Sequence, residues 1–163
     1  MNLKTFLALA SFFISLPTLS APIETLGDWA KDGRITSISG SEGTGFGFSA
    51  YIAHSKNGEQ RLYFETIRFE NHENVKICDP ESEQENTVLT INGQPVKFFT
   101  YCNTDKNKTI TQSMTAQSNA GTEFVINTFK GSNQVTISVG SFKISIPANG
   151  FTKAWNNAGG DAL

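Results

Sequence analysis

Three stretches of this sequence alternate apolar and polar residues, and a glycine-containing pair interrupts each of them. Alternation with a period of two is typical of strands, and an Asn-Gly pair favours the tight reversal of a hairpin. The clearest case surrounds Asn92-Gly93, where a type I′ turn pairs Ile91 with Gln94. That register puts four apolar residues on one face: Leu89, Ile91, Val96 and Phe98.

A second hairpin is predicted around Gly140-Ser141, where a type II′ turn would join two alternating strands. Their shared face carries Val135, Ile137, Val139, Phe142, Ile144 and Ile146. Upstream, residues 130–133 are predicted to form a loop that pairs Ile126 with Ile137, which adds a further strand. The other face of this meander is polar, so one side is exposed to solvent and another layer must cover the second side.

A third hairpin is predicted to join residues 46–52 to residues 62–69 through Asn57-Gly58. Helix is scarce, apart from a short turn around Trp29 and helical spacing near the C-terminus at Phe151, Ala154, Trp155 and Ala158. The sequence therefore predicts an all-β fold, an antiparallel sandwich or flattened barrel of about eight strands with a short C-terminal helix.

The first twenty residues have the organisation of an export signal. Lys4 supplies a positive start, residues 5–16 are uncharged and largely apolar, and Pro17 ends the run. An apolar run of this length is too short to span a bilayer of about 30 Å. Cleavage is expected after Ser20, with cleavage after Ala21 as the alternative. We expect residues 1–20 to be a signal peptide and residues 21–163 a single β domain, periplasmic or secreted and without a membrane span.

Both cysteines lie in the predicted mature domain. Cys78 and Cys102 are expected to form a disulfide, because two cysteines in an exported domain most often pair. The net charge of −2 and the lack of a basic cluster argue against a nucleic-acid partner.

Three groups of residues could suggest a calcium, zinc or phosphate site, but each lacks a feature that such a site requires. Asp79, Glu81, Glu83 and Glu85 lack the turn glycine of a calcium loop. His54 and His72 are too few for a zinc site, which needs three or four protein ligands. The glycine-rich residues 40–47 lead into a strand rather than a helix, so they do not form a phosphate loop. We therefore expect neither metal nor cofactor, and no enzyme.

Apolar side chains occur on both faces of the middle strands. Tyr63 is on the other face of its strand from Leu62, and Phe99 and Tyr101 are on the other face of their strand from Phe98. Burial on both sides is the commoner explanation of such a pattern. The alternative is an exposed aromatic patch, which on monomeric proteins often marks a partner site. Our hypothesis is that Tyr63, Phe99 and Tyr101 form part of a protein-binding face.

Two short motifs near the ends of the predicted domain resemble the invasion-associated locus B family of small exported bacterial proteins. They are Leu26-Gly27-Asp28-Trp29 and Gly150-Phe151-Thr152-Lys153-Ala154-Trp155. The family often has a cysteine shortly after the tryptophan, whereas here both cysteines lie in the middle of the chain. The resemblance implies a periplasmic or surface-associated β protein linked to host-cell colonisation.

The function expected from the sequence is that of a non-enzymatic exported binding protein that acts through a protein partner. The alternative is a periplasmic inhibitor of a hydrolase such as a lysozyme or protease, a role for which small disulfide-linked β domains are used. An inhibitor would present a protruding loop, for which residues 40–47 and 103–109 are the candidates.

Overall fold

The computed structural model describes residues 24–26, 28–41, 44–70, 85–106, 109–140 and 142–158. Nine strands and three helices lie within them. The strands are β1 (Glu24–Leu26), β2 (Arg34–Ser41), β3 (Thr44–His54), β4 (Gln60–Glu70), β5 (Glu85–Ile91), β6 (Gln94–Thr104), β7 (Ile110–Ala116), β8 (Gln134–Val139) and β9 (Phe142–Pro147). The helices are α1 (Trp29–Asp32), α2 (Asn119–Gly131) and α3 (Phe151–Ala158).

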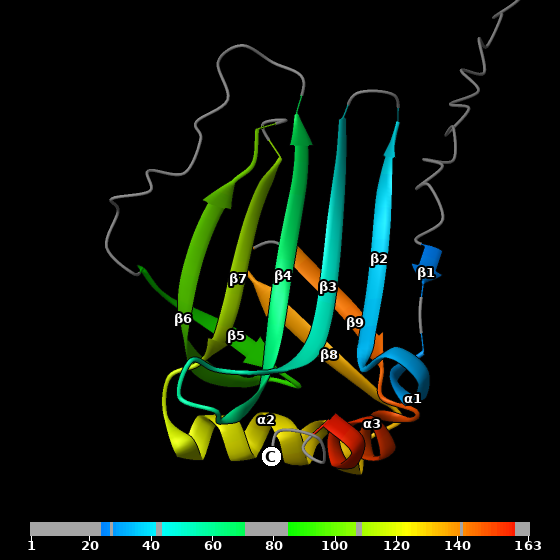
Figure 1. The fold of residues 1–163 in the computed structure, drawn as a ribbon, viewed down its shortest axis with the longest axis vertical. Helices are drawn as coiled ribbons and strands as arrows, with labels where there is room; N and C mark the ends of the chain where they lie inside the picture. The colour runs from blue at the N-terminus through cyan, green and yellow to red at the C-terminus, as the bar shows by residue number, and fades with distance from the viewer. Residues whose placement is uncertain are drawn as a thin grey trace, which may run out of the picture.

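All nine strands belong to one antiparallel sheet in the order β1-β2-β3-β4-β7-β6-β5-β8-β9. Figure 1 shows the sheet curving until β5, β8 and β9 cross behind β2, β3, β4 and β7. The predicted all-β fold is therefore confirmed, as a nearly closed, barrel-like sheet with a short C-terminal helix. The sheet closes on itself because strands this long twist and coil, so that its two inner faces can cover each other.

The three predicted hairpins are present, and the two for which a register was predicted, β5–β6 and β8–β9, have that register. At the β5–β6 turn, Asn92 and Gly93 have φ angles of 46° and 89°, and Ile91 pairs with Gln94. A type I′ turn needs a positive φ at both central positions, which Asn and Gly tolerate better than other residues. Val139 pairs with Phe142 at the end of the β8–β9 hairpin, and His54 pairs with Gln60 at the end of the β3–β4 hairpin.

Phenylalanine rings join the last strand to the first part of the sheet. Phe142 on β9 lies 5.0 Å from Phe46 and 6.2 Å from Phe48 between ring centroids, and both partners lie on β3. Within the described strands, β9 pairs through its backbone with β8 alone. Side-chain packing rather than a hydrogen-bonded ladder thus brings the two ends of the sheet together.

The three helices close one end of the barrel (Figure 1). Trp29, Phe129 and Phe151, one from each helix, are completely or almost completely buried and contact one another with centroid distances of 5.0–5.8 Å. The Trp29 indole donates a 2.7 Å hydrogen bond to the carbonyl of Pro147. Trp155 packs on Phe151 from the rim, so the C-terminal helix is part of the core.

The strand predicted around residues 124–126 is wrong, because these residues belong to α2. The helix begins after Ser118, whose hydroxyl accepts a hydrogen bond from the Gly121 N–H at 3.1 Å. Val125, Ile126 and Phe129 are its buried residues, a helical spacing. Ile137, the predicted partner of Ile126, pairs instead with Ile91 on β5.

Candidate functional site

The three aromatic residues singled out from the sequence lie on the outer face of the sheet. Tyr63 is on β4, and Phe99 and Tyr101 are on β6. The intervening strand β7 places Thr115 opposite Phe99 and Ser113 opposite Tyr101. All three aromatic side chains line one hollow, called here the aromatic pocket, with a volume of about 490 Å³. Its other lining residues are Ser55, Lys56, Asn57, Glu59, Arg61 and Thr115.

The aromatic side chains are accessible in this pocket. Tyr101 is 48 % exposed, and Tyr63 and Phe99 are half-buried. No hydrogen-bond partner of the Tyr63 or Tyr101 hydroxyl occurs among the described residues. Burial raises the pKa of Tyr63 above its usual value. Of the two explanations for apolar residues on both faces, exposure of a shared patch describes this part of the sheet better than burial.

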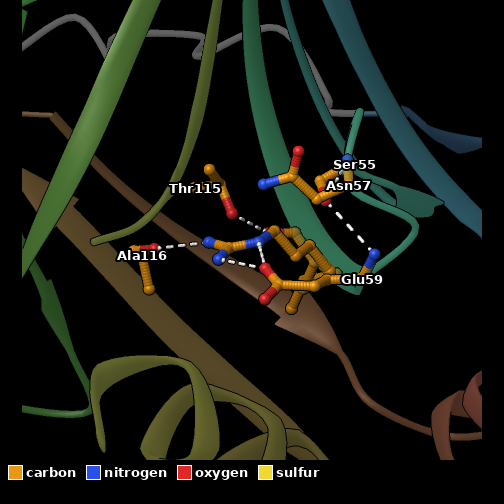
Figure 2. Close-up of polar contacts among 7 residues, drawn as sticks. Ser55, Asn57, Glu59, Thr115 and Ala116 are labelled. Atoms are coloured by element: carbon orange, nitrogen blue, oxygen red, sulfur yellow. Dashed lines mark hydrogen bonds and ion pairs between the residues drawn. The ribbon is translucent and has the colours of Figure 1, made fainter. Parts of the chain in front are cut away.

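One wall of the pocket is the turn between β3 and β4, which extends towards β6 in Figure 1. The Ser55 hydroxyl accepts hydrogen bonds from the Asn57 and Glu59 N–H groups at 3.3 and 3.2 Å. The Ser55 N–H donates to the Glu59 carbonyl at 2.8 Å, and the Gly58 N–H donates to the Ser55 carbonyl at 2.9 Å. These four bonds fix the turn, whose labelled members are drawn in Figure 2.

Arg61 anchors this turn to β7. Its Nε and Nη2 donate to one carboxylate oxygen of Glu59 at 3.2 and 2.7 Å, and its Nη1 donates to the Ala116 carbonyl at 3.0 Å. Figure 2 shows Glu59, Thr115 and Ala116 gathered around these contacts. The Arg61 side chain is only 17 % exposed, so the guanidinium is a structural part of the pocket wall. Lys56, at the exposed tip of the turn, has no ion pair among the described residues.

A second group of outer-face side chains, called here the polar cluster, lies beside the pocket on β2, β3, β4 and β7. Its members are Arg34, Ser49, Tyr51, Glu65 and Ser113. One Glu65 carboxylate oxygen accepts hydrogen bonds from the Tyr51 and Ser113 hydroxyls, both at 2.9 Å. The Arg34 guanidinium donates to the Ser49 hydroxyl at 3.2 Å, forms a 3.7 Å ion pair with Glu65 and lies 4.3 Å from the Tyr51 ring centroid.

The polar cluster and the aromatic pocket meet at two stacked rings. Tyr51 and Tyr63 are opposite each other across the β3–β4 hairpin, with ring centroids 5.4 Å apart and planes inclined by 14°. Burial and the hydrogen bond to Glu65 raise the pKa of Tyr51 to about 12. Sequence reasoning missed Tyr51, because no register was predicted for the β3–β4 hairpin that pairs it with Tyr63.

Of the remaining residues considered from the sequence, those that the structure describes are not part of this site. Cys102 follows Tyr101 on β6 with its side chain at the surface, and Cys78 lies outside the described residues. The Cys78–Cys102 disulfide therefore stays a prediction. His54 ends β3, whereas His72 and the acidic residues 79–83 also lie outside the described part of the chain.

Two further hollows are present. One, of about 220 Å³, lies between β2 and β9, and another, of about 410 Å³, lies between the start of β6 and the start of α2. Neither holds a charged group beyond a single lysine, Lys143 or Lys97. The aromatic pocket is distinguished from both by three aromatic side chains together with three charged ones.

The described residues contain no cluster of three or more His, Cys, Asp or Glu side chains suited to a metal ion. Their helices are all too short or too polar to cross a membrane. Comparison with family models, curated proteins and solved structures finds no match to this chain. The resemblance to the invasion-associated locus B family thus stays a prediction.

Proposed function

We propose that this protein is an exported, non-enzymatic binding protein that contacts a protein partner through the aromatic pocket. One observation carries the proposal: Tyr63, Phe99 and Tyr101, from two strands separated by a third, line a single accessible hollow. Tyrosine and phenylalanine bury a large area with little loss of side-chain entropy, which is why a few such residues dominate many interfaces.

The surroundings of the rings support a binding role. The turn that walls the pocket is held by its own hydrogen bonds and by Arg61, so the hollow exists before any partner arrives. A preformed pocket loses less conformational entropy on binding than a mobile one. The rings are thus presented on a rigid sheet beside a fixed turn.

Export to the periplasm or the medium is part of the proposal, and it rests on the organisation of residues 1–20. In an oxidising compartment the predicted Cys78–Cys102 bond would persist. A role in host colonisation follows from the family resemblance alone. The inhibitor hypothesis receives less support, because the aromatic pocket is a hollow that receives a partner, whereas an inhibitor loop protrudes into one.

The test compares capture of partners by the mature, oxidised wild-type protein and by two variants. Tyr101→Ala removes a pocket ring, and Val88→Ala removes a side chain of similar exposure, 50 %, on β5 outside the pocket. Proteins retained from envelope and host extracts are identified by mass spectrometry, and the affinity of each is then measured by calorimetry. We expect Tyr101→Ala to weaken the partner by roughly 30-fold, the effect of a typical interface anchor, and Val88→Ala to leave it unchanged.

The melting temperatures of both variants are expected to stay close to that of the wild type, because both side chains are half exposed. Equal affinity of the wild type and Tyr101→Ala for every retained protein would refute the binding face. A large loss of melting temperature in Tyr101→Ala would show instead that the ring stabilises the fold.

A further inference from the structure

We propose that the aromatic pocket receives an acidic side chain together with a neighbouring bulky apolar side chain from a loop of the partner protein. This inference rests on the proposed function and specifies the chemistry of the partner. The observations that carry it are the shape of the pocket, the balance of its charges and the hydrogen bonds already made by its turn.

The shape of the pocket favours an inserted side chain. Its volume of about 490 Å³ falls within the range of hollows that enclose a ligand group, roughly 300–1,000 Å³. The rings of Tyr63, Phe99 and Tyr101 provide apolar walls. An apolar side chain that enters this space contacts all three rings, as an interface anchor does.

The charges of the pocket favour a carboxylate beside that anchor. Glu59 is the sole acidic residue among the described residues of the lining, and its carboxylate is bound to Arg61 at 2.7 Å. Lys56 has no ion pair among the described residues, so its ammonium group leaves the lining with one uncompensated positive charge. The hydroxyls of Tyr63 and Tyr101 are also without a partner within the described chain and can donate. A carboxylate satisfies both the charge and these donors.

The turn itself indicates that this carboxylate belongs to a side chain rather than to a chain terminus. Terminal carboxylates are commonly captured by several free backbone N–H groups that converge on them. Here the N–H groups of Ser55, Asn57, Gly58 and Glu59 are all bonded within the turn. The pocket therefore offers side-chain donors and no free cluster of backbone donors.

The experiment titrates the isotope-labelled mature protein with blocked dipeptides and follows its amide resonances by NMR. The probes are N-acetylated, C-amidated Asp-Phe, Asn-Phe and Lys-Phe, together with N-acetylated Asn-Phe that has a free terminal carboxylate. We expect shifts at the pocket residues, with Asp-Phe amide binding about threefold tighter than Asn-Phe amide, the size of an exposed ion pair, and Lys-Phe amide weaker still. High salt should remove the preference.

Two charge-reversal variants test whether Lys56 causes this preference. Lys56→Glu is expected to reverse the order of the acidic and basic dipeptides. Lys153→Glu, which makes the same change at an exposed position on α3 away from the pocket, is expected to keep it. Both side chains are exposed, so both variants should fold.

Three results would overturn the inference. Equal binding of all dipeptides at the pocket would remove the charge preference while leaving the proposed function intact. Tight binding of the peptide with a free terminus would reassign the carboxylate to a chain end. Pocket shifts caused by an oligosaccharide such as chitotriose, with none from any dipeptide, would refute both the inference and the proposed protein-binding role.

Discussion

The polar cluster and the aromatic pocket occupy neighbouring parts of one sheet face and use the same residue types in opposite ways. In the polar cluster, the Glu65 carboxylate accepts a hydrogen bond from the Tyr51 hydroxyl and forms an ion pair with the Arg34 guanidinium. In the pocket, the hydroxyls of Tyr63 and Tyr101 have no partner among the described residues. The two tyrosines that stack at the boundary, Tyr51 and Tyr63, thus differ in whether their polar ends are bonded within the protein.

This difference separates groups that stabilise the fold from groups available to a partner. A half-buried polar group that is hydrogen-bonded within the protein contributes to the free energy of unfolding. A group with no internal partner contributes little to it, and its removal changes binding instead. The two regions therefore predict opposite outcomes for the same substitutions, and the predictions below are arranged from the largest expected effect to the smallest.

The largest effect is expected from the predicted disulfide, which would join Cys78 to Cys102, the residue after Tyr101 on β6. Cys78→Ser should lower the free energy of unfolding by about 3 kcal/mol, because loss of the bond restores freedom to the unfolded chain. Urea denaturation measures this change. Hydrogen exchange should rise more on β6, beside the pocket, than on β2 and β3. Two thiols that react freely with an alkylating reagent in native wild-type protein would show that no such bond forms.

A matched pair of glutamates distinguishes the two regions. Glu65→Ala should lower the free energy of unfolding by about 2 kcal/mol, because the half-buried Tyr51 and Ser113 hydroxyls lose their acceptor and Arg34 loses its ion pair. Glu59→Ala removes an ion pair with Arg61 in which the carboxylate is exposed, and such a pair is worth less than about 1 kcal/mol. Denaturation of both variants under the same conditions gives the comparison. Equal losses would mean that the polar cluster is no more structural than the pocket.

Removal of one hydroxyl group at a time compares the contributions of the two stacked tyrosines to stability. Tyr51→Phe should destabilise the fold by about 1 kcal/mol, because the Glu65 carboxylate loses a hydrogen bond. Tyr63→Phe should leave the free energy of unfolding almost unchanged. The rings stay in place in both variants, so stacking cancels in the comparison. The affinity for the proposed partner should fall in Tyr63→Phe and stay unchanged in Tyr51→Phe. A stability loss in Tyr63→Phe as large as that in Tyr51→Phe would contradict the division between a stabilising cluster and a binding pocket.

The smallest effect concerns alkaline pH. The pKa of Tyr51 is raised to about 12, so the folded protein keeps this proton while the unfolded chain, with a pKa near 10, has lost it. The associated stability is present below pH 10 and declines as the pH rises from about 10 towards 12. Ultraviolet titration of tyrosinate should show one phenol that ionises last. That step should disappear in Tyr51→Phe and persist in Tyr101→Phe.

Hairpin structure was predictable from the sequence because its determinants are local. Asn92-Gly93 fixes the turn, and the alternation of apolar residues around it then allows one register. Helix α2 was not predictable by the same reasoning. Phe124 and Ile126 alternate as strand residues do, and only the Ser118 cap with the spacing of Val125 and Phe129 indicates a helix.

The candidate site was predictable in part. Apolar residues on both faces of β4 and β6 identified Tyr63, Phe99 and Tyr101, because alternation is a property of each strand alone. Their approach to the β3–β4 turn was not predictable, because β7, which separates the two strands, comes later in the chain than both. Nothing in the sequence around Lys56 and Arg61 indicates that they line a pocket, because this follows only from the position of the turn beside β6.

The order of the strands also determines when the aromatic pocket can exist during folding. Strands β2, β3 and β4 form one meander of sequence neighbours, and β5, β6 and β7 form another. The pocket straddles the junction between them, where β4 pairs with β7 through long-range contacts such as Phe64 with Met114. Such pairings form late because closure of the intervening chain is entropically unfavourable. A newly synthesised chain can therefore complete its hairpins before the pocket exists, so the proposed partner would recognise only fully folded molecules.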